Sequence, residues 1–366
     1  MSRSLSIPAP TRDAVIDNCY TGTPGAMVNG VKTFSKVADA LEDAPSNSAR
    51  PYIIFIKNGK YYEKLTIAKP FITLVGESRD KAILTFDIAS DTRKPDGTTY
   101  GTFGSASVSV IASNFSAENL TVENGFDYPA NAAKAKNDPT KFANPQAVAL
   151  KTDAGSDKAV FKNVSFIGYQ DTLYINAGRH YFKNCLITGH VDFIFGAGQA
   201  VFDDCDIVSR DRGSTSNNGY VTAASTQLAS PYGFLFINSR LKKETLAMAD
   251  GSVTLGRPWH PTTNLLDGSR AADPNAVGSV VFKNCQMEAH IASKGWDAMS
   301  GKDKDGNTIW FQPQDSRFYE YGSTGPGALK GDTRKVLTDS EAQKYTIANV
   351  LGGWDPEQPA TDMLGH

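Results

Sequence analysis

Short hydrophobic runs separated by polar turns follow one another along most of the chain. Four such runs lie between residues 50 and 90: Ile53–Ile56, Leu65–Ile67, Ile72–Val75 and Ile83–Phe86. Runs of this length, rich in Val, Ile and Phe and bounded by Gly, Pro, Asn or Asp, predict short β-strands joined by turns. The pattern therefore predicts an all-β fold whose regular part begins near residue 50.

Three consecutive segments repeat this pattern with the same order of residue types. They begin at Val160 (VFKNVSFIGYQDTLYINAGRH), Tyr181 (YFKNCLITGHVDFIFGAGQA) and Val201 (VFDDCDIVSR), so the period is 21 residues and then 20. A period near 20 is typical of leucine-rich repeats and of parallel β-helices. The LxxLxLxxN frame of leucine-rich repeats is absent from the chain. We therefore predict a solenoid of the parallel β-helix type, with coils of about 20 residues.

Helical patterns flank the repeats. A helical spacing is seen in Phe34, Val37, Ala38 and Leu41, just before Pro45, and it predicts a helix that covers the exposed apolar end of the solenoid. Near the other end, Thr338 and Glu341 have the spacing of a capping box. They predict a second helix, which either packs along the solenoid or closes its far end.

Polar stretches between the strand-like runs predict insertions between coils, where solenoids place binding residues. These stretches cover residues 88–106, 125–145, 209–232 and 260–278. No shift of composition marks a domain boundary. We expect residues 1–30 to form an N-terminal extension and residues 31–366 to form a single domain.

Composition excludes several classes of function. The 366 residues contain 37 Lys and Arg against 39 Asp and Glu, and no basic run occurs. Such a balance gives no positive field for nucleic acid or anionic lipid, so we expect neither partner. No apolar stretch approaches the roughly 18 residues of a membrane helix. The first residues, MSRSLSIPAPTRD, lack the apolar centre of a secretory signal, which leaves open a cytosolic chain or the mature form of an exported one.

The four cysteines are too few for a disulfide-built scaffold and show no CxxC spacing. Cys185 and Cys205 occupy the same place in consecutive coils, 20 residues apart. The rung spacing of a β-helix, ~4.8 Å, falls within the Cα separation that a disulfide accepts. We predict a bridge between them in an oxidising compartment and two stacked buried thiols otherwise. Cys19 and Cys285 are expected to be unpaired.

Two aspartates mark the candidate chemistry. When GYQD at Gly168 is aligned with GHVD at Gly189, Asp171 falls 21 residues before Asp192, which is one coil. Carboxylates on adjacent rungs, ~4.8 Å apart, cannot both ionise readily, so one pKa should rise and the two groups can divide acid/base and nucleophilic roles. The alternative is that both aspartates serve turns, although both adjoin strongly β-forming runs.

A cation is needed to stabilise one of these carboxylates. Arg257, in LGRPWHP, lies between Gly256 and Pro258 and close to Trp259, whose flat face suits a sugar ring. Simple alternation would place Asp192 on the same side of its strand as core residues. A bend or bulge at the strand end is therefore required for the side chain to reach the surface.

Five separated motifs resemble those of pectin methylesterases, carbohydrate esterases that demethylate polygalacturonate. In chain order they are GKYYE at 59–63, QAVAL at 146–150, QDTLY at 170–174, DFIFG at 192–196 and LGRPW at 255–259. The resemblance covers nearly the whole chain and implies a right-handed parallel β-helix. It also implies that Asp192 is the nucleophile, Asp171 the acid/base and Arg257 the residue that holds the nucleophile. Gln146 and Gln170 would surround the oxyanion.

The resemblance implies hydrolysis of the C6 methyl esters of polygalacturonate through a covalent intermediate, giving de-esterified pectin and methanol. The expected partner is methyl-esterified homogalacturonan, bound by a monomer that is secreted or periplasmic. No metal and no cofactor are expected, because the carboxylate pair and the arginine supply nucleophile and proton. Five side chains are expected to line the sugar groove: Phe193, Tyr174, Trp259, Trp296 and Met299.

Two histidines adjoin these motifs. His190 stands where many members of that family have Thr, and we expect it to be an accommodated neighbour with no catalytic duty. His260 follows Trp259. It is the only other histidine that we expect near the substrate, and we assign it no chemical role.

Other functions fit the sequence less well. No GxSxG elbow of a serine esterase occurs, and the Asn-Thr-Asp, Gly-Asp-Asp and Gly-His-Gly signatures of polygalacturonases are missing. The acidic run 303–307 lacks the spaced ligands of a calcium loop, which disfavours a pectate lyase. The remaining alternatives are a glycosidase with a polygalacturonase-like fold and a non-catalytic polysaccharide-binding solenoid. The solenoid would have no need of Asp171 and Asp192 one coil apart.

Overall fold

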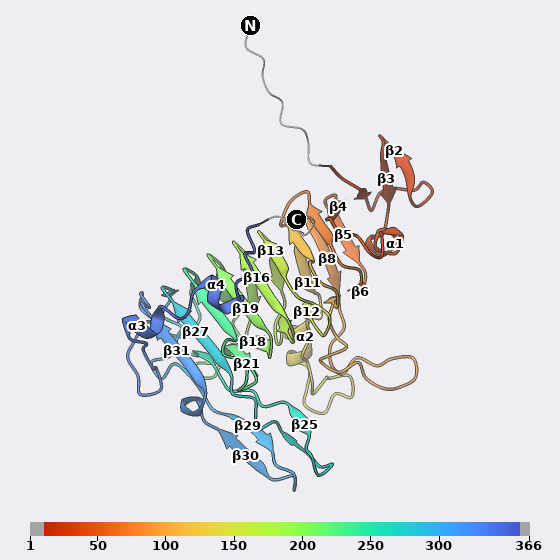
Figure 1. Ribbon diagram of the computed structural model, residues 1–366. Helices are drawn as coiled ribbons and strands as arrows, with labels where there is room; N and C mark the ends of the chain where they lie inside the picture. The colour runs from red at the N-terminus through yellow and green to blue at the C-terminus, as the bar shows by residue number, and fades with distance from the viewer. Residues whose placement is uncertain (1–10, 359–366) are drawn as a thin grey trace.

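The computed structural model describes residues 11–358, which form a parallel β-helix (Figure 1). A typical coil contributes one short strand to each of three sheets that run along the solenoid axis, and the coils at the two ends contribute fewer. The predicted all-β solenoid is therefore confirmed. Two antiparallel hairpins and four short helices project from this body or cover it.

The three sheets contain twelve, eight and seven strands within the described residues. The twelve-stranded sheet comprises, in spatial order, β2 (Ala26–Val28), β3 (Val31–Phe34), β1 (Ala14–Ile16), β4 (Tyr52–Ile56), β7 (Ile72–Gly76), β10 (Ser116–Glu118), β13 (Ala159–Lys162), β16 (Arg179–Lys183), β19 (Gln199–Asp203), β22 (Phe234–Ile237), β27 (Ser279–Lys283) and β31 (Arg317–Tyr321). The eight-stranded sheet comprises β5 (Gly59–Tyr62), β8 (Ala82–Phe86), β11 (Thr121–Asn124), β14 (Ser165–Ile167), β17 (Leu186–Gly189), β20 (Asp206–Ser209), β23 (Arg240–Lys243) and β28 (Gln286–Met287). The seven-stranded sheet comprises β6 (Leu65–Ile67), β9 (Val108–Val110), β12 (Leu150–Thr152), β15 (Leu173–Ile175), β18 (Val191–Gly196), β21 (Gly219–Ala224) and β24 (Val253–Gly256).

Stacking of equivalent residues builds the core. The phenylalanine that opens each repeat forms a column of fully buried, stacked rings, with centroids 4.5 to 4.7 Å apart: Phe161, Phe182, Phe202, Phe236 and Phe282. The asparagine of each repeat turns the corner between sheets in the left-handed conformation, at Asn119, Asn163, Asn184, Asn238 and Asn284. Asn tolerates positive φ better than most residues. Each repeat in the sequence thus corresponds to one coil of the solenoid, whose strands form one rung of the sheets.

The amino-terminal part differs from the prediction. Strand β1 lies inside the twelve-stranded sheet, between β3 and β4, and its Ala14 and Ile16 are buried in the core. The residues of the expected extension 1–30 that the structure describes therefore belong to the fold, and regular structure begins well before residue 50. Residues 1–10 lie outside the described range. The three-residue β1 has too short an apolar run to stand out from a loop in the sequence.

The helices cover apolar surface of the solenoid. Helix α1 (Val37–Asp43) buries Val37 and Ala40 against the first strands, as predicted for a cap, but Phe34 ends strand β3 and lies outside the helix. Helix α3 (Asp339–Ala342) has the predicted capping box between Thr338 and Glu341. It is followed by α4 (Ile347–Val350), and both pack on the outer face of the twelve-stranded sheet (Figure 1). This segment therefore packs along the solenoid.

The insertions surround the seven-stranded sheet. Helix α2 (Tyr128–Ala133) lies in the second, and the hairpin β25 (Thr262–Asn264) with β26 (Arg270–Ala272) lies in the fourth. A second hairpin, β29 (Met299–Lys302) with β30 (Thr308–Phe311), and a 3₁₀ turn at Pro313–Asp315 come later. The predicted insertion 209–232 is too long, because it contains the regular strand β21.

All four cysteines lie within the described residues and are free thiols. Cys185 and Cys205 are buried, and their Sγ atoms donate to the carbonyl oxygens of Phe161 and Phe182. The structure thus contains the stacked thiols. The bridge stays a prediction for an oxidising compartment.

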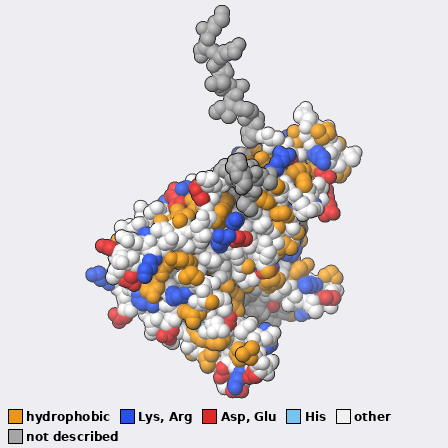
Figure 2. Space-filling view, in the orientation of Figure 1, with side chains coloured by type: hydrophobic (Ala, Val, Ile, Leu, Met, Phe, Trp, Pro, Cys, Tyr) orange, Lys and Arg blue, Asp and Glu red, His pale blue; other side chains and the backbone are white. Residues whose placement is uncertain are grey.

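Charges of both signs are interspersed on the molecular face shown in Figure 2, among hydrophobic and neutral side chains. Such a mixture offers no extended field of one sign to a polyanion. Among residues 11–358, no helix combines the length and the apolar character required to cross a membrane.

Candidate active site

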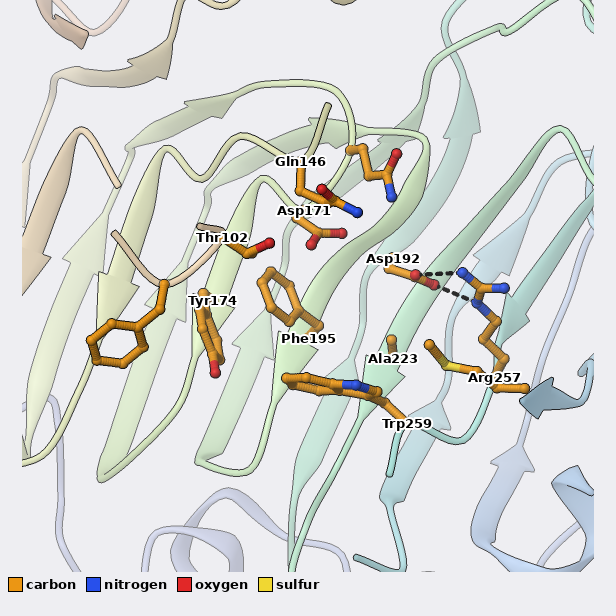
Figure 3. A pocket seen from close by; sticks show the side chains of 12 residues that line it. Thr102, Gln146, Asp171, Tyr174, Asp192, Phe195, Ala223, Arg257 and Trp259 are labelled. Carbon is orange, nitrogen blue, oxygen red and sulfur yellow. Dashed lines mark hydrogen bonds and ion pairs between the residues drawn. The ribbon is translucent and has the colours of Figure 1, made fainter. Parts of the chain in front are cut away.

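A pocket of about 380 Å³ opens on the outer face of the seven-stranded sheet (Figure 3). It brings together eight residues singled out in the sequence: Gln146, Gln170, Asp171, Tyr174, Asp192, Arg257, Trp259 and Met299. Four further residues complete its lining: Thr102, Phe103, Phe195 and Ala223. The pocket therefore combines a carboxylate pair, a cation, two amides and an aromatic wall.

Both aspartates have left-handed backbone conformations, with φ of 65° at Asp171 and 53° at Asp192. They occupy equivalent positions on adjacent rungs, since Leu173 pairs with Ile194 in the ladder between β15 and β18. Positive φ is uncommon for a residue with a side chain and is concentrated at functional sites. It turns the two carboxylates out of the strand and into the pocket. This is the bend that the alternation pattern required.

The left-handed residue also determines where the next side chain points. Phe193 and Ile194 are both fully buried in the core, and the ladder between β18 and β21 has a bulge between Val191 and Ile194. Gly189 makes room for the inward turn, because a Cβ there would lie 2.3 Å from the Cβ of Phe193. The expectation that Phe193 lines the groove is therefore wrong.

Trp296 is also misplaced by the sequence interpretation. Its side chain is buried in the core, where it stacks on Phe318 with ring centroids 4.4 Å apart. It bridges to Gly256 in parallel register, so it occupies an interior rung position next to the strand that precedes Arg257. Trp296 is thus close to the site along the solenoid axis, but its side chain is not exposed in the groove.

Arg257 forms a bidentate ion pair with Asp192. Its Nε donates to Oδ1 at 2.8 Å and its Nη2 donates to Oδ2 at 2.6 Å (Figure 3). The guanidinium also lies 4.1 Å from the centroid of the Tyr220 ring. Burial alone would lower the pKa of Arg257, but its hydrogen bonds and the charge of Asp192 outweigh burial and leave that pKa raised. The pair fixes both carboxylate oxygens in one orientation.

Asp171 lacks such a partner among the described side chains and is 8% exposed. Burial raises the pKa of Asp171 well above its usual range, the negative charge of Asp192 raises it further, and Arg257 opposes both effects only in part. Its main-chain N–H donates to the carbonyl oxygen of Val191 at 3.0 Å, which ties it to the next rung. One carboxyl of the pair is thus held by a cation, while the other favours its protonated form.

The two glutamines enter the pocket from adjacent rungs, since the N–H of Ala147 donates to the carbonyl oxygen of Gln170 at 3.1 Å. Within residues 11–358, Oε1 of Gln146 is buried without a hydrogen-bond partner. Figure 3 shows the Gln146 side chain beside Asp171. Both side-chain amides therefore line the space that a ligand would occupy.

Aromatic rings form the wall opposite the amides. Tyr174 stacks on Phe195 with centroids 4.2 Å apart, and Trp259 meets both rings nearly edge-on. Phe195 was missed in the sequence, although the register with Tyr174 one coil earlier could have identified it. Thr102 and Phe103 come from the first insertion, which has no repeat to align.

The two histidines stay outside the pocket lining. His190 is buried against Tyr128, with ring centroids 4.3 Å apart, and its Nδ1 accepts a hydrogen bond from the N–H of Val191. Burial and the nearby arginines lower its pKa to about 3, so its ring is neutral at ordinary pH. His260 stacks on Phe311 at 3.5 Å and supports the loop that carries Trp259. Among the described residues, no group of three or more His, Cys, Asp or Glu is arranged to hold a metal ion.

Known proteins of similar sequence and structure belong to one family. A family model described as pectinesterase matches residues 26–354. The chain is 48% identical over 362 residues to pectinesterase A of Dickeya chrysanthemi, with 98% of each chain covered. The solved pectin methylesterase PemA from Erwinia chrysanthemi matches with a TM-score of 0.90 and 48% identity, over 96% of this chain and 100% of that one. A pectin methylesterase solved in complex with a hexasaccharide matches with the same score, identity and coverage.

The raised pKa of Asp171 has a consequence for stability. Between the unfolded and folded pKa values the native state holds a proton that the unfolded state has lost, so stability falls as pH rises through this window. Asp171→Asn removes this loss and keeps a side chain that tolerates positive φ. We expect the variant to be more stable than the wild type at neutral pH, and the difference to vanish below about pH 4.

Calorimetric Tm values measured across this pH range test the expectation, with the exposed Asp305→Asn as a control that leaves the profile unchanged. A variant that is less stable than the wild type, by a margin that grows as pH rises, would show that the native state favours ionised Asp171.

Proposed function

The chain belongs to the pectinesterase family, and we propose that Asp192, Asp171 and Arg257 carry out its hydrolysis of pectin methyl esters. The observation that carries this assignment is the asymmetry of the carboxylate pair. Asp192 is held by both arms of Arg257, whereas burial and the neighbouring charge favour a proton on Asp171. A nucleophile and an acid are thus present at once on adjacent rungs.

In the first step, a carboxylate oxygen of Asp192 attacks the C6 carbonyl carbon of a methylated galacturonate unit. The side-chain amides of Gln146 and Gln170 donate to the oxyanion that forms. The bond from carbon to the methoxy oxygen then breaks, and Asp171 gives its proton to the departing oxygen, so that methanol leaves. An acyl-enzyme anhydride on Asp192 remains, and Asp171 is ionised.

In the second step, Asp171 takes a proton from a water molecule as the water oxygen attacks the same carbonyl carbon. The bond between this carbon and the Asp192 oxygen breaks, which releases the galacturonic acid carboxyl group, and its remaining proton passes to the solvent. Arg257 pairs again with Asp192, and Asp171 is again protonated. Both groups return to their starting states without any further reactant.

The aromatic wall of Tyr174, Phe195 and Trp259 accounts for recognition of a sugar, because flat rings pack on pyranose faces. We propose that Met299, at the base of the β29–β30 hairpin, closes the same groove. A non-catalytic solenoid would keep the aromatic wall. It would gain nothing from burying a carboxyl group without a partner beside a second one, since burial of such a group is costly.

We further infer that the partner is methyl-esterified homogalacturonan, and that the protein meets it after export, in a secreted or periplasmic location. The relative solved with a hexasaccharide supports an extended carbohydrate ligand. A monomer suffices, because one chain supplies both carboxyl groups, the arginine and the amides. The near balance of 37 Lys and Arg against 39 Asp and Glu favours neither nucleic acid nor an anionic membrane as a partner.

Product analysis tests the reaction type. Incubation with highly methylated pectin is expected to release methanol without forming new reducing ends, because the glycosidic bonds stay intact. Both products are measured in the same samples. New reducing ends without methanol would instead favour a glycosidase, and the absence of both products would favour a binding protein.

Substitution of each aspartate separates the two roles. Asp192→Ala is expected to fold normally and to lose at least ~10³-fold in turnover on pectin. Asp171→Ala is expected to be severely impaired on methyl esters, because methoxide leaves poorly without a proton. On an aryl ester of galacturonic acid, whose phenolate leaves unaided, Asp171→Ala should recover a larger share of wild-type acylation than Asp192→Ala.

The measurement is the burst of phenol on mixing enzyme and aryl ester, with the wild type as reference. A burst confined to Asp171→Ala supports the assignment. Equal recovery in both variants, or a burst only in Asp192→Ala, would mean that the roles are exchanged or that water attacks directly.

A further inference from the structure

The row of side chains that forms the aromatic wall extends one rung further, to a lysine. Lys151 in β12 pairs with Tyr174 in β15, which pairs with Phe195 in β18. All three side chains point outward from the seven-stranded sheet. Lys151 is nevertheless only 5% exposed, so a charged group is buried beneath the ring of Phe103.

Three contacts compensate the buried ammonium. Nζ of Lys151 donates to the main-chain carbonyl oxygen of Phe103 at 2.7 Å and lies 3.3 Å from the centroid of the Phe103 ring. The nearest carboxylate oxygen, Oδ2 of Asp153, is 3.9 Å away. Burial lowers the pKa of Lys151, and Asp153 opposes this shift only in part. The ammonium thus binds the backbone and the ring of one residue.

Phe103 itself is 53% exposed and lines the pocket beside Thr102. Its ring meets the edge of Tyr174, with centroids 6.5 Å apart at an interplanar angle of 84°. A second lysine fixes the end of the same segment, since Nζ of Lys64 donates to the carbonyl oxygen of Ala106 at 2.7 Å. The two lysines therefore fix the segment that carries the exposed ring of Phe103.

A buried cation at this position has a cost that an apolar side chain would not have. Methionine has nearly the same length and would fill the same space without desolvating a charge. The gain that offsets the cost is the fixed placement of Phe103, because both favourable short contacts of the ammonium are made with that residue. The lysine therefore acts on the wall of the groove.

The distance along the solenoid shows which part of a substrate this wall meets. The ring of Phe103 lies over the ammonium of Lys151 in β12, and β12 lies two rungs from β18, about 10 Å along the axis. This is further than the ring that carries the reacting ester extends. The Phe103 ring therefore faces a neighbouring unit of an extended chain.

We propose that Lys151 is a positioning residue that holds Phe103 as the wall of a subsite for a sugar unit next to the reacting one. Through this wall it determines how tightly extended pectin chains bind, and it takes no part in the chemistry. The proposal rests on the pectinesterase activity proposed above.

Lys151→Met tests this role by separating binding from turnover. KM for highly methylated pectin is expected to rise about tenfold, which corresponds to about 1.4 kcal/mol, while kcat stays within about twofold. On the methyl ester of a single galacturonate unit, which does not reach Phe103, kcat/KM should be unchanged. Calorimetric titration with a galacturonate hexamer should show an affinity lowered by the same factor, and this measurement does not depend on catalysis.

Lys335→Met is the matched control. Its ammonium also binds a carbonyl oxygen, that of Ser316 at 2.9 Å, and lies 4.9 Å from the Tyr319 ring, but it is remote from the pocket. It should leave KM, kcat and hexamer affinity as in the wild type. Equal effects of the two lysine substitutions would reduce the role of Lys151 to general stability and overturn the proposal.

Phe103→Ala covers the case in which Lys151→Met fails to fold, because the side chain removed is exposed. It should raise KM for pectin to a similar extent, and adding Lys151→Met should cause little further loss of hexamer affinity. Unchanged affinity in Phe103→Ala, or an equal loss of kcat/KM on the single-unit ester in Lys151→Met, would overturn the proposal. Absence of methanol release by the wild type would instead overturn the proposed function, whatever the hexamer titrations show.

Discussion

The spacing of about 4.8 Å between parallel rungs governs both the stability and the chemistry of this protein. It places equivalent residues of successive coils in contact, whatever their type. For phenylalanines such as Phe182 and Phe202 the contact is favourable and builds a continuous core. For Asp171 and Asp192 the same spacing forces two carboxyl groups together, at a cost that Arg257 relieves for only one of them. The reactive asymmetry follows directly from the repeat.

The backbone turns this constraint into a site. Left-handed conformations at Asp171 and Asp192 direct both side chains outward and send the following residues into the core. The left-handed backbone thus coincides with the two residues that react, and the ladder between β18 and β21 carries a bulge at the same place. The floor and walls of the groove then come from ordinary outward positions, such as Tyr174 and Phe195, and from insertions between the coils.

The repeat explains how much could be predicted from the sequence. Residues that recur with the coil period were placed correctly, including the aspartate pair, and the fold followed from the same period. Phe193 was misplaced because alternation fails after a left-handed residue, and Trp296 because nothing in its local sequence marks it as an interior rung. Phe103 was missed because its insertion has no equivalent in other coils, so that only its contacts in the folded protein, with Lys151 and Tyr174, show its place.

The central claim is that Asp171 carries a proton in the resting protein while Asp192 is paired with Arg257. Difference infrared spectroscopy at neutral pH, between the wild type and Asp171→Asn, tests it most directly, because a protonated carboxyl group has a carbonyl stretching band that a carboxylate lacks. The account predicts that this band is present in the wild type and lost in Asp171→Asn, while the exposed Asp305→Asn retains it. Loss of carboxylate bands in Asp171→Asn, with no change in the protonated band, would contradict it.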